Sequence, residues 1–174
     1  MSIHHFHYNF REELTKKLKE HYSEDISKYR HEMTRVQQID EAEQLILDYF
    51  ERLAADLEEV LAVSDGEVGL EGPEGDTIVR FSIRENFIRF TRRDKFIEVK
   101  VGKYDDVDDM VESTILGYVV AGEKKAQTRR IGKVHGGASF DENTMNQYMR
   151  EAFGNLFKEF RVEEELLKEE ALKE

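Results

Sequence analysis

The amino-acid sequence predicts an α+β fold in which an antiparallel meander sheet of four or five strands packs with two N-terminal helices and a long C-terminal helix. A change of period along the chain supports this class. Apolar residues recur every three or four positions in the first 63 residues and again after residue 139, as on one face of a helix. Between residues 77 and 135 they recur mainly at every second position, as on one face of a strand.

The length indicates one domain spanning residues 1–174, because this size falls within the usual range for a single hydrophobic core. The domain divides into a helical part, a Gly-rich loop, an antiparallel sheet, a C-terminal helix and an acidic tail that can fray. In that order these parts span residues 10–63, 64–76, 77–135, 139–162 and 163–174.

The helical part is predicted to form two helices. Residues 10–36 carry an apolar stripe at helical spacing, which indicates a long surface helix with room for a kink. Asp40 followed by Glu43 resembles a capping box, so a second helix is expected to start there and to end before Gly66. The first stripe contains Phe10, Leu14, Leu18, Tyr22, Ile26, Tyr29, Met33 and Val36, and the second contains Leu45, Ile46, Tyr49, Phe50, Leu53, Leu57, Val60 and Leu61.

The segment at residues 64–76 has the composition of a loop. Its glycines recur every third residue around Pro73, the only proline of the chain. A phosphate-binding loop would need a following Gly-Lys-Ser/Thr or a basic setting, and this segment is acidic instead. We therefore interpret the glycines as turn residues.

Three strands follow from the period of two. In each strand large apolar residues alternate with polar ones, and short polar links at residues 85–86 and 93–95 predict hairpin turns. The inward residues are Val79, Phe81 and Ile83, then Ile88 and Phe90, then Ile97, Val99 and Val101. A fourth strand is expected at residues 114–120 and a fifth, less regular one at residues 126–134.

The C-terminal helix is predicted from a capping box and a wide apolar face. Ser139 and Glu142 have the spacing of such a box, and the face contains Met145, Tyr148, Met149, Ala152, Phe153, Leu156, Phe157 and Phe160. Strong helix formers continue to the end of the chain, so the helix can extend through residues 163–174.

Composition excludes several classes of function. The chain has no cysteine, which excludes disulfides, thiolate zinc sites and cysteine nucleophiles. The N-terminal residues contain no apolar stretch long enough for a signal peptide, and about 18 consecutive apolar residues occur nowhere, so we expect a cytoplasmic protein without a membrane segment.

The net charge of −12 is unevenly distributed. Residues 76–135 contain 13 Lys and Arg against 10 Asp and Glu, whereas the rest of the chain contains 13 against 28. The predicted strands are therefore mildly basic, and the helical ends are strongly acidic. This charge disfavours non-specific binding to nucleic acid, although a local basic face can still bind it.

The polar side of the predicted strands is one candidate binding surface. Arg80, Arg84, Arg89 and Lys100 are expected to point away from the core on neighbouring strands. Such a face can bind nucleic acid or another anion, although only Phe87 and Phe96 are available on this side for base stacking. The alternative is a face whose arginines pair with acidic side chains or with an acidic helix.

A second candidate lies before the C-terminal helix. Arg129, Arg130, Lys133 and His135 precede two glycines and a helix start, and unpaired N–H groups at a helix start attract phosphate or carboxylate. The alternative is an irregular strand followed by a helix cap. An enzyme or binder acting on an anionic small molecule would use this segment.

Metal and catalytic sites are not predicted. His4, His5 and His7 cluster near the N-terminus without the spacing of a catalytic zinc site. Four aspartates at residues 105–109 lack the glycine and glutamate of an EF-hand loop. We predict no catalytic residue, no metal and no cofactor.

These observations favour a non-catalytic protein–protein interaction or regulatory protein, such as an inhibitor, an immunity protein or a chaperone. The first and last helices are the expected contact elements, because their apolar stripes can exceed what one sheet face covers. A protein partner or a second copy of the chain would cover the remainder, and a nucleic acid is the alternative partner.

Overall fold

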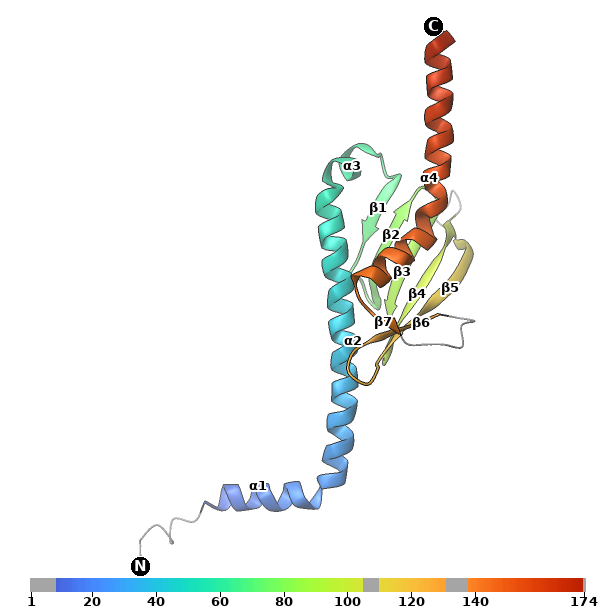
Figure 1. Ribbon diagram of the computed structural model, residues 1–174. Coiled ribbons are helices and arrows are strands. Elements are labelled where there is room, and N and C mark those ends of the chain that lie inside the picture. The colour runs from blue at the N-terminus through green and yellow to red at the C-terminus, as the bar shows by residue number, and fades with distance from the viewer. Residues whose placement is uncertain (1–8, 105–109, 131–137, 174) are drawn as a thin grey trace, which may run out of the picture. The chain divides into compact units, whose positions relative to one another are not determined.

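The computed structural model describes residues 9–104, 110–130 and 138–173, and it confirms an α+β fold with an antiparallel sheet and a long C-terminal helix (Figure 1). The helices are α1 (Phe10–His21), α2 (Ser23–Asp56), α3 (Glu58–Val63) and α4 (Glu142–Lys173). The strands are β1 (Val68–Glu71), β2 (Thr77–Ile83), β3 (Asn86–Arg92), β4 (Phe96–Tyr104), β5 (Met110–Val120), β6 (Gln127–Arg130) and β7 (Ala138–Ser139). The chain separates into two compact units, residues 1–37 and residues 38–174.

The prediction of two N-terminal helices with a boundary at Asp40 was wrong, because four helices form in the described chain and the boundaries lie elsewhere. α1 begins after Asn9, whose side-chain oxygen accepts a hydrogen bond from the Glu12 N–H at 3.3 Å. The first break falls at Tyr22 and the second at Leu57. Asp40 lies inside α2, where its carboxylate forms an ion pair with Arg92 at 3.0 Å instead of capping a helix.

The prediction of four or five strands was also wrong, because the sheet has seven strands, paired antiparallel in chain order. β1 lies within the segment predicted as a Gly-rich loop and pairs with β2, with Val68 opposite Ile83. β7 has only two residues and pairs with β6. Alternation cannot be recognised over two residues, and Gly69 interrupts it in a strand of four.

The core lies between one face of the sheet and two helices, α2 from Gln38 onward and α4. Phe50 of α2 contacts Phe81 and Phe90, with ring centroids 5.9 and 5.7 Å apart. On α4, Phe153 contacts Phe81 and Tyr148 contacts Phe90. These aromatic contacts join strands β2 and β3 to both helices, so the rings form the centre of residues 38–174.

Alternation then places a second set of residues on the opposite face, here called the polar face and defined by Arg80, Ser82, Arg89, Glu98 and Lys100. Each follows or precedes a buried core residue on its strand, as Arg80 does between Val79 and Phe81. The meander therefore positions polar residues of β2, β3 and β4 side by side.

Candidate functional site

Three predicted cations form a row across the polar face. Arg80 of β2 lies opposite Arg89 of β3, and Arg89 lies opposite Lys100 of β4. Glu71 of β1 continues the row beside Arg80. Like charges on directly opposed positions destabilise a sheet unless other groups compensate them, so the partners of each cation decide what the row can bind.

Arg80 is compensated within the chain. Its guanidinium forms an ion pair with Glu71 at 2.6 Å and donates a hydrogen bond to the Tyr104 hydroxyl at 3.1 Å. It also lies over the Tyr104 ring, 4.9 Å from the centroid, and that ring packs on Phe87 at 4.3 Å. Phe87 is fully buried, so it presents no open face on which a nucleic-acid base could stack.

Lys100 is compensated as well. Its ammonium lies 3.7 Å from the carboxylate of Glu98, which Arg93 also approaches at 3.7 Å. Glu98 is 8% exposed, so the two cations stabilise a carboxylate that burial would otherwise disfavour.

Arg89 differs from its two neighbours. It forms no ion pair with the part of the chain that the structure describes. Its Nε, like that of Arg80, is buried without a hydrogen-bond partner there. A hollow of about 320 Å³ lies beside Arg89 and Arg80. Its other lining residues are Glu71, Gly72, Glu74 and Thr77.

Arg84 does not join this row. It lies in the β2–β3 turn with a positive φ of 56° and reaches α4. Its guanidinium donates two hydrogen bonds to the Glu163 carboxylate at 2.8 and 3.0 Å, and it lies 4.9 Å from the centroid of the Phe160 ring. The hydrogen bonds from Arg84 lower the pKa of Glu163 below its usual range. Arg84 is therefore engaged by an acidic helix.

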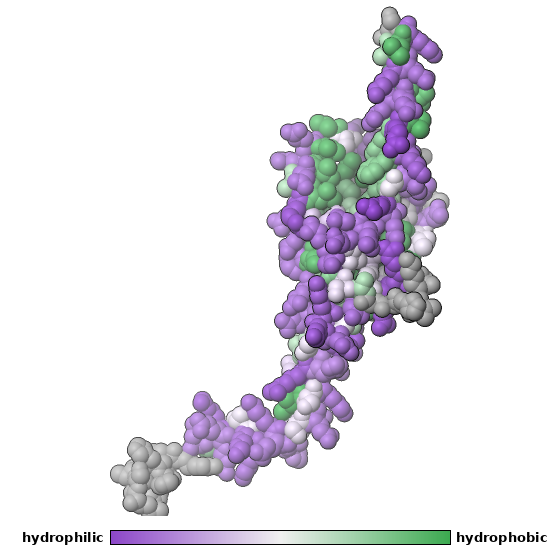
Figure 2. Space-filling view, in the orientation of Figure 1, coloured by the Kyte–Doolittle hydropathy of each residue, from purple (hydrophilic) through white to green (hydrophobic). Residues whose placement is uncertain are grey.

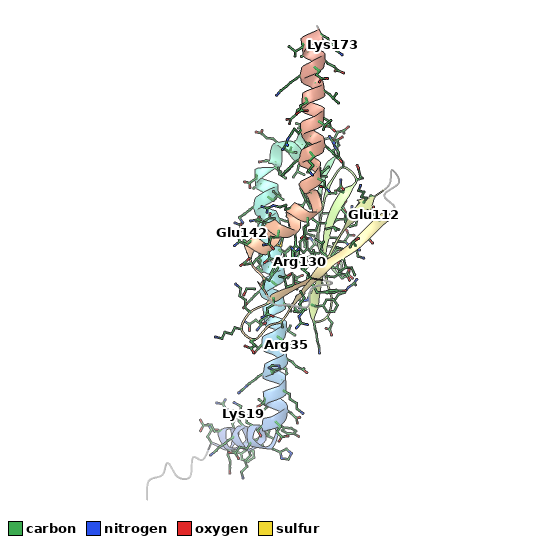
Figure 3. All side chains as sticks on the ribbon, turned by 45° about the vertical axis from the view of Figure 1, so that its right-hand side comes forward. Lys19, Arg35, Glu112, Arg130, Glu142 and Lys173 are labelled. Carbon is green, nitrogen blue, oxygen red and sulfur yellow. The ribbon has the colours of Figure 1, made fainter. Side chains whose placement is uncertain are left out.

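The second predicted cluster is only partly within the described residues. Arg130 of β6 forms an ion pair with Glu151 of α4 and lies over the ring of Tyr148 at 5.8 Å (Figure 3). Burial raises the pKa of Tyr148, whose hydroxyl is hydrogen-bonded to Thr128. Arg129 is exposed on the neighbouring position, opposite Tyr118.

Several predicted residues lie outside the described part of the chain. These are Lys133 and His135 of the second cluster, together with His4, His5, His7, Asp105, Asp106, Asp108 and Asp109. Over residues 9–104, 110–130 and 138–173, no group of three His, Asp or Glu side chains could hold a metal ion.

Tyr104 contacts Arg80 of the row, and we did not predict it as part of a site. Tyr104 occupies an even-numbered position, four residues after Lys100 on the same strand. Extending the period of two by two steps from Lys100, through Gly102 to the end of β4, would have placed it on the same side of the strand as Lys100.

The helices carry exposed apolar side chains, as their stripes predicted. None of residues 9–37 is buried, although this segment contains six large apolar residues that are between 44% and 66% exposed. We call these six the N-terminal stripe: Phe10, Leu14, Leu18, Tyr22, Tyr29 and Met33.

A smaller exposed set follows at the end of α4, which runs to Lys173 through the residues predicted as an acidic tail. Leu167 is 65% exposed and Leu172 is 87% exposed. Figure 2 shows hydrophobic residues at the surface over α3 and along the last turns of α4, where most of the surrounding surface is hydrophilic.

Comparison with known proteins gives no relative: the chain matches no protein-family model, no curated protein and no solved structure. Among the described residues, no helix combines the length and the apolar character needed to cross a membrane.

Proposed function

We propose that this chain is a non-catalytic protein–protein interaction protein that binds its partner through the N-terminal stripe. The observation that supports this function is that no residue between 9 and 37 is fully buried, although the segment is helical and carries six large, exposed apolar side chains.

Helix physics supports the need for a partner. Isolated helices shorter than about 12–15 residues are marginal in water, and most helices in proteins are stabilised by packing of their apolar face. α1 has 12 residues and no buried residue. Burying a half-exposed large apolar side chain contributes roughly 1 kcal/mol, so a partner on the N-terminal stripe would stabilise both the helix and the complex.

The apolar residues at the end of α4 support the same class of function. Leu166, Leu167 and Leu172 are more than half exposed, on turns that contain no buried residue. Exposed apolar surface on a helix is typical of contact elements that a partner covers.

The test compares two double variants of α1 with equal charge change. L14E/L18E places two carboxylates on the N-terminal stripe, whereas K16Q/K19Q removes two positive charges from exposed positions of the same helix. Glu and Gln are both good helix formers, so helicity measured by circular dichroism should be retained in each.

We expect affinity capture from native lysate to recover specific partners with the wild type and with K16Q/K19Q, and to lose them with L14E/L18E. Identical capture by all three proteins would refute a role for the stripe. Binding through the end of α4 would instead be lost in L166E/L167E alone.

A second candidate function is the binding of an anionic ligand at Arg89. The observation that favours it is that Arg89, unlike Arg80 and Lys100, has no acidic partner among the residues described. A guanidinium can hold a carboxylate or a phosphate group by paired hydrogen bonds.

The corresponding test is binding at low salt. We expect inorganic phosphate or a single-stranded oligonucleotide to raise the unfolding temperature of the wild type, with an effect that weakens as salt rises and is lost in R89Q. K124Q, which removes an exposed cation from the β5–β6 loop outside both candidate sites, is the matched control. No stabilisation at low salt would remove this candidate.

A further inference from the structure

We infer that the partner on the second half of the N-terminal stripe is a second copy of this chain, arranged as a parallel two-stranded coiled coil over residues 22–36. This inference rests on the proposed function, and it adds the identity and the orientation of the partner. Three observations carry it, namely the spacing of the exposed apolar residues, the point where that spacing ends, and the charges beside it.

The spacing is that of a coiled-coil seam. From Tyr22 the apolar residues follow at Ile26, Tyr29, Met33 and Val36, so the steps alternate between four and three residues. Such alternation averages 3.5 residues per turn and keeps one seam facing a partner helix, with Ile26 and Met33 at a positions and Tyr29 and Val36 at d positions. Tyr29 is 62% exposed and Met33 is 47% exposed.

The seam ends where the helix becomes part of the core. The next a position is Asp40, which forms an ion pair with Arg92, and the neighbouring Ile39 is 1% exposed. At its other end the seam stops at Tyr22, the residue that ends α1 and whose carbonyl accepts the first hydrogen bond of α2, from Ile26. The seam therefore occupies the part of α2 up to Val36, which includes no buried residue (Figure 3, where Arg35 is labelled).

The flanking charges select a parallel pair. Asp25 occupies a g position and Arg30 the following e position, and in a parallel pair a g residue faces the e residue of the next heptad on the other helix. Asp25 of each copy would then face Arg30 of the other, giving two symmetric ion pairs. Neither residue forms an ion pair within the described residues, so both remain available.

An antiparallel pair would be opposed by the same residues. There e positions face e positions and g positions face g positions, so Arg30 would approach Arg30 of the second copy and Glu32 would approach its counterpart. Like charges that face each other disfavour the antiparallel pair. The charged residues beside the seam therefore oppose the antiparallel orientation as well as stabilising the parallel one.

The chain is well suited to a cross-linking test because it contains no cysteine. In a parallel pair identical a positions meet, so M33C should form a disulfide-linked dimer under mild oxidation. H31C, at the outward f position, is the matched control and should remain monomeric in reducing-agent-free electrophoresis. In an antiparallel pair Tyr29 faces Met33, so preferential cross-linking between mixed Y29C and M33C chains would overturn the inference.

Sedimentation equilibrium tests the charges. The wild type should sediment with the mass of two chains, and D25R or R30D alone should raise the dimer dissociation constant by roughly 3- to 10-fold. The charge swap D25R/R30D recreates the facing pairs in the opposite sense and should restore the wild-type value. K28D, at the outward c position, should have no effect.

Failure of this inference is distinguishable from failure of the proposed function. A wild type that remains monomeric at high micromolar concentration, or that sediments as a dimer insensitive to R30D and the charge swap, would overturn the parallel self-pairing. If L14E/L18E still abolished capture of a partner, the proposed interaction function would stand with a different protein as the partner.

Discussion

The two parts of α2 differ in what covers the apolar side of the same helix. Between Gln38 and Asp56 four apolar residues are buried, because Ile39, Ala42, Ile46 and Phe50 are each at most 3% exposed. From Ser23 to Gln37 no residue is buried, although Tyr29 and Met33 are also large.

The difference lies in the surroundings and hardly in the helix itself. The covered part meets the strands at Phe81 and Phe90, whereas none of residues 23–37 is buried. Spacing does not account for the difference, because the buried residues Ile39, Ala42, Ile46 and Phe50 also follow one another at steps of three and four. A periodic stripe thus predicts that a helix needs a covering surface without identifying which surface it is.

The largest expected effect comes from truncating one aromatic residue in each part. F50A removes a ring that is 2% exposed and contacts three other rings, so we expect the free energy of unfolding to fall by about 3–5 kcal/mol. Y29A removes a ring that is 62% exposed and should change it by less than about 0.5 kcal/mol. Denaturant unfolding, measured at a concentration where the chain is monomeric, compares the two.

A loss of stability in Y29A comparable to that in F50A would contradict the comparison, because it would mean that Tyr29 is covered within a single chain. Raising the protein concentration sharpens the test. If a second copy covers Tyr29, the stability of the wild type should rise with concentration and that of Y29A should rise less.

A smaller change in the free energy of unfolding is expected when the ion pairs at the beginning of the covered part of α2 are removed. Arg92 of β3 contacts Asp40 at 3.0 Å and Glu43 at 3.3 Å, and its side chain is 19% exposed. R92M keeps most of the aliphatic stem and removes both ion pairs, so we expect a loss of about 1 kcal/mol in the free energy of unfolding.

The matched control is R52M. Arg52 forms an ion pair with Glu142 at 3.3 Å, but both side chains are more than half exposed, so its loss should cost less than about 0.5 kcal/mol. Equal effects of R92M and R52M in denaturant unfolding would show that Arg92 does not anchor the covered part of α2.

Much of this fold could be predicted from sequence because its signals are local. The period of two located β2, β3 and β4 and put Val79, Phe90 and Val99 on the core side. The helix boundary at Asp40 could not be predicted correctly, because an acidic residue followed by glutamate also occurs inside helices. Arg92, 52 residues further along the chain, takes the Asp40 carboxylate that a cap would have used.

The sequence predicted where the cations of the candidate site lie. It could not predict which of them are already paired with other side chains of the chain. Arg80, Arg89 and Lys100 do lie in one row, as alternation implies. Whether each cation is compensated depends on residues distant in sequence, such as Glu71 and Tyr104 for Arg80. Arg84 left the row because a left-handed turn residue redirects its side chain to Glu163, and periodicity contains no information about such a turn.

The smallest expected effect extends the comparison to α4, which also has a covered and an exposed part. Leu156 is buried, residues from Arg161 onward are exposed, and Glu163 stands near the change from one to the other. Its hydrogen bonds from Arg84 hold the last contacted turn of α4 to the β2–β3 turn.

The pKa of Glu163 is lowered in the folded chain, and this direction determines how the stability that Glu163 contributes changes with pH. A carboxyl whose pKa is lower when folded stabilises the fold fully above its ordinary pKa, and that contribution is lost as pH falls through the lowered value. E163Q should therefore be less stable than the wild type at neutral pH, with a difference that shrinks steadily in the acid range. Denaturant unfolding at a series of pH values measures it, with E164Q on the neighbouring exposed position as the control. If the difference in free energy of unfolding between E163Q and the wild type stayed constant with pH, Glu163 would act by packing alone. The charge of Glu163 would then not determine where the covered part of α4 ends.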